Sequence, residues 1–240
     1  MKLSFPLLAV AAAISAGALA EELSPDTWKD AYSKRNVRLG IALDEFRKIP
    51  FPDPDNQYHY VVPSPKCSND PIAENYIYMR FLSDQTGYEK VGVIKCGYYG
   101  TYTFMVNPYM DEQSLEQISP LLVDWAPDTN YYFFKPDDAK SYFLFHIAMD
   151  PTNFLFWEVA GAFEEALGPP THRKSVDLQN AFGVTVTSTT LVWENGVSKI
   201  RFVSNNGQID RHTLDYELTP ILKIVKDKLE SIKKESRSRI

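Results

Sequence analysis

The sequence of 240 residues has few of the features on which enzymes and membrane proteins depend. It contains two cysteines and four histidines, and no histidine stands in a His-x-His or His-Glu-x-x-His metal spacing. After the leading apolar run, no stretch approaches the roughly 18 consecutive apolar residues that a membrane-spanning helix needs. We therefore expect no transmembrane segment in the mature chain and assign no metal-binding residue.

Motifs of catalysis are also absent. There is no Gly-x-Ser-x-Gly nucleophile elbow and no glycine loop that would cradle a phosphate. Asp53 and Asp55 resemble the opening of a calcium loop, but Tyr58 and Ser64 stand where such a loop needs glycine and a bidentate glutamate. We assign no catalytic or cofactor-binding residue, and we expect no cofactor.

The histidines fall at positions typical of structural or surface residues. His146 lies in an aromatic strand, where packing is the usual role, and His59, His172 and His212 lie in or near expected loops. Two carboxylates that face each other across a cleft cannot be recognised in a sequence. A hydrolase whose site is assembled from distant acids and a histidine therefore stays an alternative.

Basic residues are fewer than acidic ones, and the one basic stretch that stands out lies at the C-terminal end. The formal net charge is −6, and without Lys2 the balance is 24 basic against 31 acidic residues, or −7. A protein of this sign repels phosphate backbones, so we expect no nucleic-acid partner. Residues 223–239 carry seven basic and three acidic residues. They are predicted to form a solvated helix face, or alternatively a docking strip for anionic lipid or an acidic partner.

The first 20 residues have the form of a signal peptide. Lys2 precedes an apolar run from Phe5 to Leu19, and Ala18-Leu19-Ala20 is a small-x-small cleavage site. No cysteine follows Ala20, so lipidation is not expected. The short alanine-rich leader resembles bacterial ones, and we predict export to the periplasm with cleavage after Ala20.

The two cysteines, Cys67 and Cys96, both belong to the predicted mature chain. An even count in an exported protein favours a disulfide, which would stabilise the fold by roughly 3 kcal/mol. Two unpaired buried thiols are the alternative. Without a Cys-x-x-Cys pair, thiol oxidoreductase chemistry is not indicated.

Turn and helix signals divide the chain into short elements. Asn195-Gly196 predicts a two-residue hairpin turn that would set Leu191 opposite Ile200. Asp150-Pro151 and Gly168 mark the two ends of a helix. The other expected elements are helices at 24–32, 40–46 and 111–118, a proline-rich loop at 51–71, strands at 91–96, 98–106, 131–134, 141–149 and 208–218, and a final helix from Pro220.

Hairpins with helices at the ends and one between them indicate an α+β fold with a mainly antiparallel sheet and helices packed on one face. We predict a single domain over residues 21–240, or two divergent helix-plus-meander halves at 21–150 and 151–240. Tyr142 and Leu144 should point to the second face of the sheet, and the proline-rich loop is its expected cover.

Short motifs carry a resemblance to a known family. Gly40 to Phe46 reads Gly-hydrophobic-small-x-x-acid-hydrophobic, and another helix ends at Leu167-Gly168-x-Pro170 before a strand bearing Trp193. This is similar to the helix-then-meander module of the outer-membrane assembly lipoprotein and β-lactamase-inhibitor-protein folds. The resemblance implies a non-catalytic envelope protein that binds other proteins, and it transfers no functional residue.

The sequence thus favours a non-catalytic binding or protein-interaction module, with a protein of the cell envelope as the expected partner. The alternatives are a periplasmic hydrolase and a carrier of a small apolar ligand. The first requires an exposed apolar patch, the second a cleft with acids of perturbed pKa, and the third an enclosed apolar cavity. The sequence alone gives no prediction of the oligomeric state.

Overall fold

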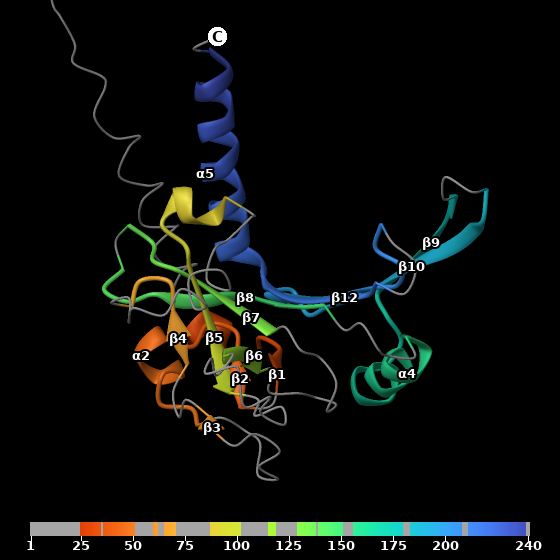
Figure 1. Ribbon diagram of the computed structural model, residues 1–240, viewed down its shortest axis with the longest axis horizontal. Helices are drawn as coiled ribbons and strands as arrows, with labels where there is room; N and C mark the ends of the chain where they lie inside the picture. Colours follow the sequence, from red (N-terminus) through yellow and green to blue (C-terminus); the bar gives the residue numbers. More distant parts are fainter. Residues whose placement is uncertain are drawn as a thin grey trace, which may run out of the picture.

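A computed structural model describes residues 25–34, 36–50, 60–61, 65–70, 87–101, 115–118, 129–137, 139–150, 156–179, 183–207 and 211–238. Its centre is an antiparallel sheet with the strand order β3-β5-β7-β8-β12-β11-β10-β9, and β4 and β6 also pair with β5 (Figure 1). Helices pack against this sheet. The predicted α+β class with a mainly antiparallel sheet is confirmed.

The first half of the chain supplies one end of the sheet. Its elements are η1 (Pro25–Trp28), β1 (Ser33–Lys34), β2 (Val37–Arg38), α2 (Leu43–Phe46), β3 (Tyr60–Val61), β4 (Lys66–Cys67), η2 (Tyr88–Val91), β5 (Ile94–Thr101), β6 (Leu115–Ile118), β7 (Thr129–Phe134) and β8 (Phe143–Met149). The helix predicted at 111–118 is wrong over its second half, because Leu115–Ile118 pair with β5. Pairing with a neighbouring strand outweighs the local helix preference.

The second half begins with a helix followed by a meander. Its elements are α4 (Phe156–Leu167), β9 (His172–Gln179), β10 (Thr185–Glu194), β11 (Ser198–Val203), β12 (Thr213–Leu218) and α5 (Thr219–Ser238). Each of these strands pairs with the next along the chain, and β12 joins β8 of the first half. Strand β9 was not predicted.

One face of the sheet packs against α2 and α4. The Phe46 ring of α2 lies 4.8 Å from that of Tyr131, and the Phe163 ring of α4 lies 5.4 Å from that of Trp193. Segment 30–32 adds backbone contacts to the β10–β11 turn, where Tyr32 N donates to Ser198 Oγ at 2.9 Å. This face holds most of the aromatic core.

The opposite face is covered by η2 and α5, so helices lie on both faces and not on one. The Tyr88 ring of η2 lies 5.5 Å from that of Tyr132, and α5 lies against η2 and β8. These two helices supply a cover for the second face. The proline-rich loop, its expected cover, lies largely outside the described residues.

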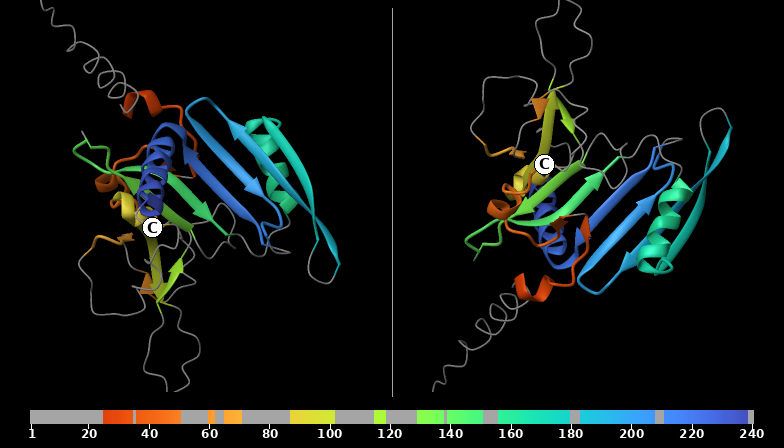
Figure 2. Two further views of the ribbon diagram at one scale, coloured as in Figure 1. Left: turned by 90° about the horizontal axis from the view of Figure 1, so that it is seen from above. Right: turned by 90° about the horizontal axis from the view of Figure 1, so that it is seen from below.

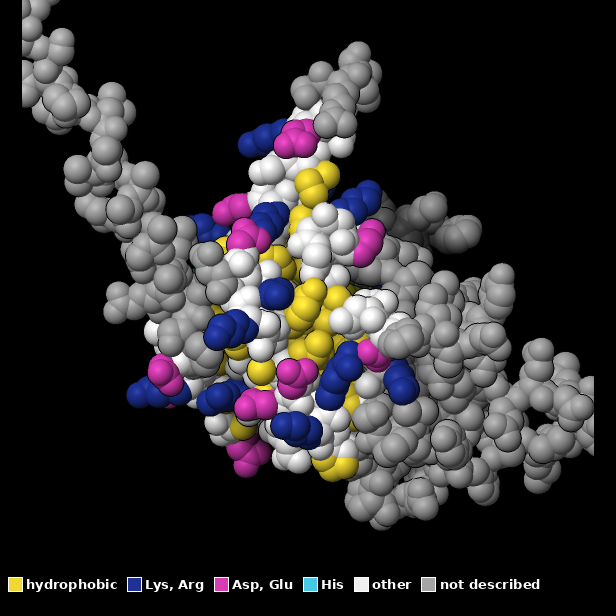
Figure 3. Space-filling view, turned by 90° about the vertical axis from the view of Figure 1, so that its left-hand side faces the viewer, with side chains coloured by type: hydrophobic (Ala, Val, Ile, Leu, Met, Phe, Trp, Pro, Cys, Tyr) yellow, Lys and Arg dark blue, Asp and Glu magenta, His cyan; other side chains and the backbone are white. Residues whose placement is uncertain are grey.

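Helix α5 packs against the core through its first half. Ile221, Leu222 and Val225 are buried, whereas Leu229 and Ile232 are half-buried. Its remaining length stands out from the body with charges of both signs along it (Figure 3). Of the described helices, none is long and apolar enough to cross a membrane.

The predicted disulfide between Cys67 and Cys96 is confirmed. It joins β4 to β5 at residues that face each other in the sheet. Asp70 Oδ2 accepts a hydrogen bond from Cys67 N at 2.8 Å, and the Asp70 carboxylate also pairs with Arg47. The disulfide indicates maturation in an oxidising compartment.

The β10–β11 turn forms where it was predicted, but the register differs. Gly196 takes a φ of +88°, and Asn195 Oδ1 accepts from Ser198 N at 2.9 Å. The central residues are therefore Gly196 and Val197, and Leu191 faces Phe202 instead of Ile200. Since the shift is two residues, every side chain keeps its predicted face.

Candidate functional site

The β9–β10 hairpin projects from the end of the sheet beyond α4 (Figures 1 and 2). Strand β10 pairs with β11 only from Thr190 onward, so its first half is paired with β9 alone. Every residue of β9 is exposed. An uncovered two-stranded ribbon of this kind is marginally stable in water.

One face of this hairpin is aliphatic. Side chains alternate along a strand, so Val176 and Leu178 share a face with Val186, and Val184 continues it. Three of these side chains are among the most exposed large apolar groups described, with Val176 at 44%, Leu178 at 37% and Val184 at 50%. We name these four residues the hairpin aliphatic face.

The other face of the hairpin is polar and close to α4. Thr187 Oγ1 donates to Asp177 Oδ1 at 2.8 Å, and the Ser175 and Thr189 hydroxyls lie 3.1 Å apart. The contrast between the two faces makes the projecting hairpin amphipathic. Its apolar side points away from the face that α4 covers.

Helix α4 adds two exposed apolar side chains near the root of the hairpin. Trp157 is 57% exposed and Leu167 is 41% exposed. The Arg173 guanidinium lies 5.1 Å from the centre of the Trp157 ring, a cation–π contact that fixes the indole beside β9. Trp157 therefore lies on the α4 side of β9, on the face opposite the hairpin aliphatic face.

A polar cluster lies on the α5 side of the sheet. His146 Nε2 is 3.0 Å from Asp215 Oδ1, and Arg201 Nη2 donates to Asp215 Oδ2 at 2.6 Å. The His146 ring stacks on Tyr132 with centroids 5.2 Å apart. Burial alone would raise the pKa of Asp215, but the hydrogen bond and charge of His146, with Arg201, hold that pKa below its ordinary value.

This cluster is poorly arranged for catalysis. Asp215 engages the Nε2 atom of His146, and the Nδ1 atom is buried without a hydrogen-bond partner among the described residues. A general base must present a free nitrogen to its substrate. The geometry fits a buried structural pair that links β8 to β12.

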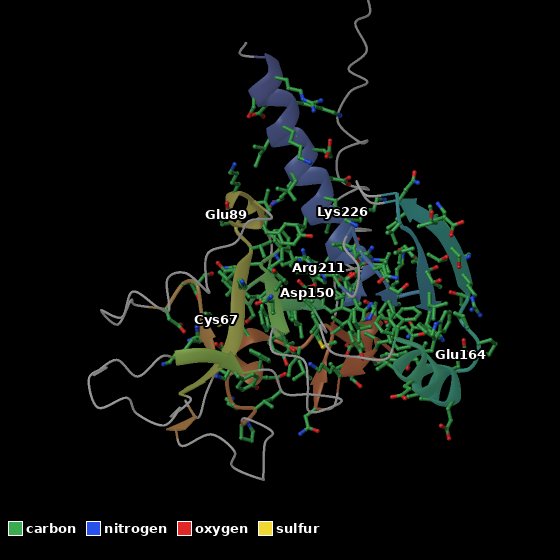
Figure 4. All side chains as sticks on the ribbon, turned by 45° about the vertical axis from the view of Figure 1, so that its right-hand side comes forward. Cys67, Glu89, Asp150, Glu164, Arg211 and Lys226 are labelled. Carbon is green, nitrogen blue, oxygen red and sulfur yellow. A yellow bond between two sulfur atoms is a disulfide. The ribbon has the colours of Figure 1, made fainter. Side chains whose placement is uncertain are left out.

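The remaining sequence candidates are dispersed. His172 is exposed beside Glu194, and His212, expected near the surface, is buried with its ring 5.7 Å from that of Phe156. Asp150 and Arg211 form an exposed ion pair of 2.9 Å (Figure 4). His59, Asp53 and Asp55 lie outside the described residues, as does most of 51–71.

Sequence reasoning missed Lys34, whose side chain is buried. It is 2% exposed, and its Nζ donates to Thr129 Oγ1 at 3.0 Å. No motif marks this lysine, because its burial depends on strands that lie about a hundred residues further along the chain. It links the N-terminal segment to β7 and β8.

Comparison with protein-family models, with curated proteins and with solved structures finds no match to this chain.

Proposed function

We propose that the protein is a non-catalytic protein-binding module whose contact surface is the hairpin aliphatic face. The observation that carries this proposal is the exposure of an aliphatic face on a projecting ribbon. Contiguous apolar exposure in a folded protein usually marks a site of interaction.

Fully burying a valine or leucine side chain contributes about 1.5–3 kcal/mol. Val176, Leu178 and Val184 of the hairpin aliphatic face keep much of their surface in water. A partner that covered this face would therefore gain affinity and also support the projecting ribbon.

The proposal includes export. Residues 1–20 act as a signal peptide, and the mature chain works in the periplasm with a protein of the cell envelope as its partner. The Cys67–Cys96 disulfide supports this location, since disulfides persist in oxidising compartments.

Affinity capture from envelope extract tests the proposal with matched variants of the mature chain. The test variant carries Val176→Thr and Leu178→Thr. Threonine is β-branched and therefore suits a strand, but its polar hydroxyl group replaces the apolar surface. The control variant carries Gln179→Thr on the polar face of the same strand. We expect wild type and control to retain a discrete partner that the test variant loses. Equal capture by all three, or capture of nothing, would overturn the proposal.

A hydrolase is the second candidate, favoured by the pairing of His146 with Asp215. It requires His146 to act on a substrate, although its free nitrogen is buried. Hydrolysis of ester or peptide substrates that disappears in a folded His146→Gln variant would favour this candidate over the binding module.

A further inference from the structure

Strand β9 is an open sheet edge. At the other end of the sheet, the short strands β3, β4 and β6 all pair with β5. Strand β9 pairs with β10, and no described strand pairs with its outer side. It contains no proline, the residue that natural proteins often use to block an edge.

The register shows which backbone groups face outward. Ser204 N donates to Thr189 O at 2.8 Å, so the backbone of Thr189 points toward β11. Its neighbour Thr190 therefore points toward β9, where it faces Lys174. Hydrogen-bonding direction alternates along a strand. The outward N–H and C=O groups of β9 thus belong to Arg173, Ser175, Asp177 and Gln179.

Two of these edge residues, Arg173 and Asp177, carry opposite charges and lie at equal distances from Ser175 along the strand. Arg173 stands two residues before Ser175, and Asp177 stands two residues after it. In an antiparallel pair of two β9 strands with a two-fold axis at Ser175, each Arg173 faces Asp177 of the second copy. An axis at Lys174 or Val176 would leave both charges facing uncharged residues.

The side chains are held in place for such pairing. Arg173 lies over Trp157, and Asp177 accepts from Thr187, both on the α4 side of the sheet. A two-fold axis perpendicular to the sheet keeps like faces together. Arg173 and Asp177 of opposite copies would therefore meet on one face, and the two hairpin aliphatic faces would join on the other.

We propose that two copies of this chain form a symmetric dimer through antiparallel pairing of their β9 strands, centred on Ser175. The pairing turns two marginal ribbons into one four-stranded arm, because Arg173, Ser175 and Asp177 all gain backbone partners. The proposal deepens the proposed function, since it names a second copy as one partner of the same hairpin.

Cysteine cross-linking tests the register. Directly opposed residues of a hydrogen-bonded antiparallel pair have Cα atoms about 5.5 Å apart, within the range of a disulfide. A Ser175→Cys variant has one free thiol, since Cys67 and Cys96 are bonded to each other. We expect mild oxidation to give a covalent dimer. Gln179→Cys is the control, because its symmetry mate lies at the far end of the paired strands. Failure of Ser175→Cys to cross-link, or equal cross-linking by both variants, would overturn the proposal.

Sedimentation of charge variants tests the pairing independently. Arg173→Asp and Asp177→Arg each place like charges opposite each other and should weaken the dimer about tenfold or more. An equimolar mixture of the two restores both opposite-charge pairs and should sediment as a dimer. A monomeric wild type, or a mixture as dissociated as its components, would contradict the proposal. If the protein is a monomer that still captures an envelope partner through Val176 and Leu178, the dimer proposal is wrong but the proposed binding function is supported.

Discussion

Gly40 joins the N-terminal segment to the sheet at a position where no side chain larger than a hydrogen atom fits. Its φ of +83° lies in the left-handed region, and its N donates to Leu144 O at 2.7 Å. A Cβ atom there would stand 2.8 Å from the Trp28 ring. Both the backbone and the space beside it therefore require glycine.

Gly40→Ala should lower the free energy of unfolding by about 1–3 kcal/mol. Gly92→Ala is the matched control, because its φ is +80° and an added Cβ would meet nothing within 4 Å. Urea denaturation should show a larger loss for Gly40→Ala than for Gly92→Ala. Equal losses would show that contact with Trp28 does not matter.

Asp215 links β12 to β8 and β11 through its contacts with His146 and Arg201 on the α5 side of the sheet. Its pKa lies below the ordinary value of 3.8, so the folded state favours the carboxylate. The stability that this gives is present above the ordinary pKa and is lost as the pH falls through the lowered one. The contribution is therefore complete at neutral pH.

Asp215→Asn should cost about 1.5–3 kcal/mol at pH 7, since it removes charged hydrogen bonds to His146 and Arg201. The gap between wild type and variant should shrink once the pH falls below about 4. Urea midpoints measured from pH 7 to pH 3 would check this. A gap that stays constant over that range would contradict the assigned role.

At the scale of elements, the disulfide adds a covalent link between β4 and β5, which are also paired in the sheet. Cys67 and Cys96 are 29 residues apart. Replacing both by serine should cost about 3 kcal/mol on the chain-entropy account. Thermal unfolding of the double variant against oxidised and reduced wild type checks this. The variant should match the reduced protein, and a variant as stable as the oxidised protein would contradict the account.

Helix α5 offers a test of where its packing ends. Ile221 is fully buried, whereas Ile232 is half-buried on the projecting part. Ile221→Ala should lose about 2–5 kcal/mol, and Ile232→Ala clearly less. Chemical denaturation of the two variants measures both losses. A comparable loss at Ile232 would mean that the outer half of α5 is packed as well.

The elements that could be predicted were those with strong local signals. Asn195-Gly196 marked its hairpin, and the faces of β10 and β11 were right because a two-residue register shift preserves alternation. Strand β9 was missed because its residues are charged or polar except for Val176 and Leu178. The Val-x-Leu and Val-x-Val alternations at 176–178 and 184–186 were the available signal.

Only part of the candidate site could be predicted from the sequence. The Cys67–Cys96 pair followed from cysteine count. The pairing of His146 with Asp215, 69 residues apart, depends on the adjacency of β8 and β12, which no local pattern encodes. An ion pair between two strands that are distant in the sequence cannot be predicted until the strand order of the sheet is known.

At the scale of the whole molecule, the two ends of the sheet differ in how many strands, helices and covalent links hold them in place. The β5 end is occupied by short strands and fixed by the disulfide, and helices cover both faces at the centre. At the β9 end, no described strand pairs with the outer side of β9, and the hairpin aliphatic face is exposed among the described residues. Stability should therefore decline toward the hairpin, as is common for regions that bind partners.

Site-specific photocross-linking in intact cells tests the central claim most directly, because it reports what touches the hairpin where the protein works. A photoreactive amino acid replaces Val184 on the hairpin aliphatic face, and the control position is Glu45, which is exposed on α2. The account predicts a discrete adduct with another envelope protein from Val184 and none from Glu45. The same adducts from both positions, or none from Val184, would contradict it.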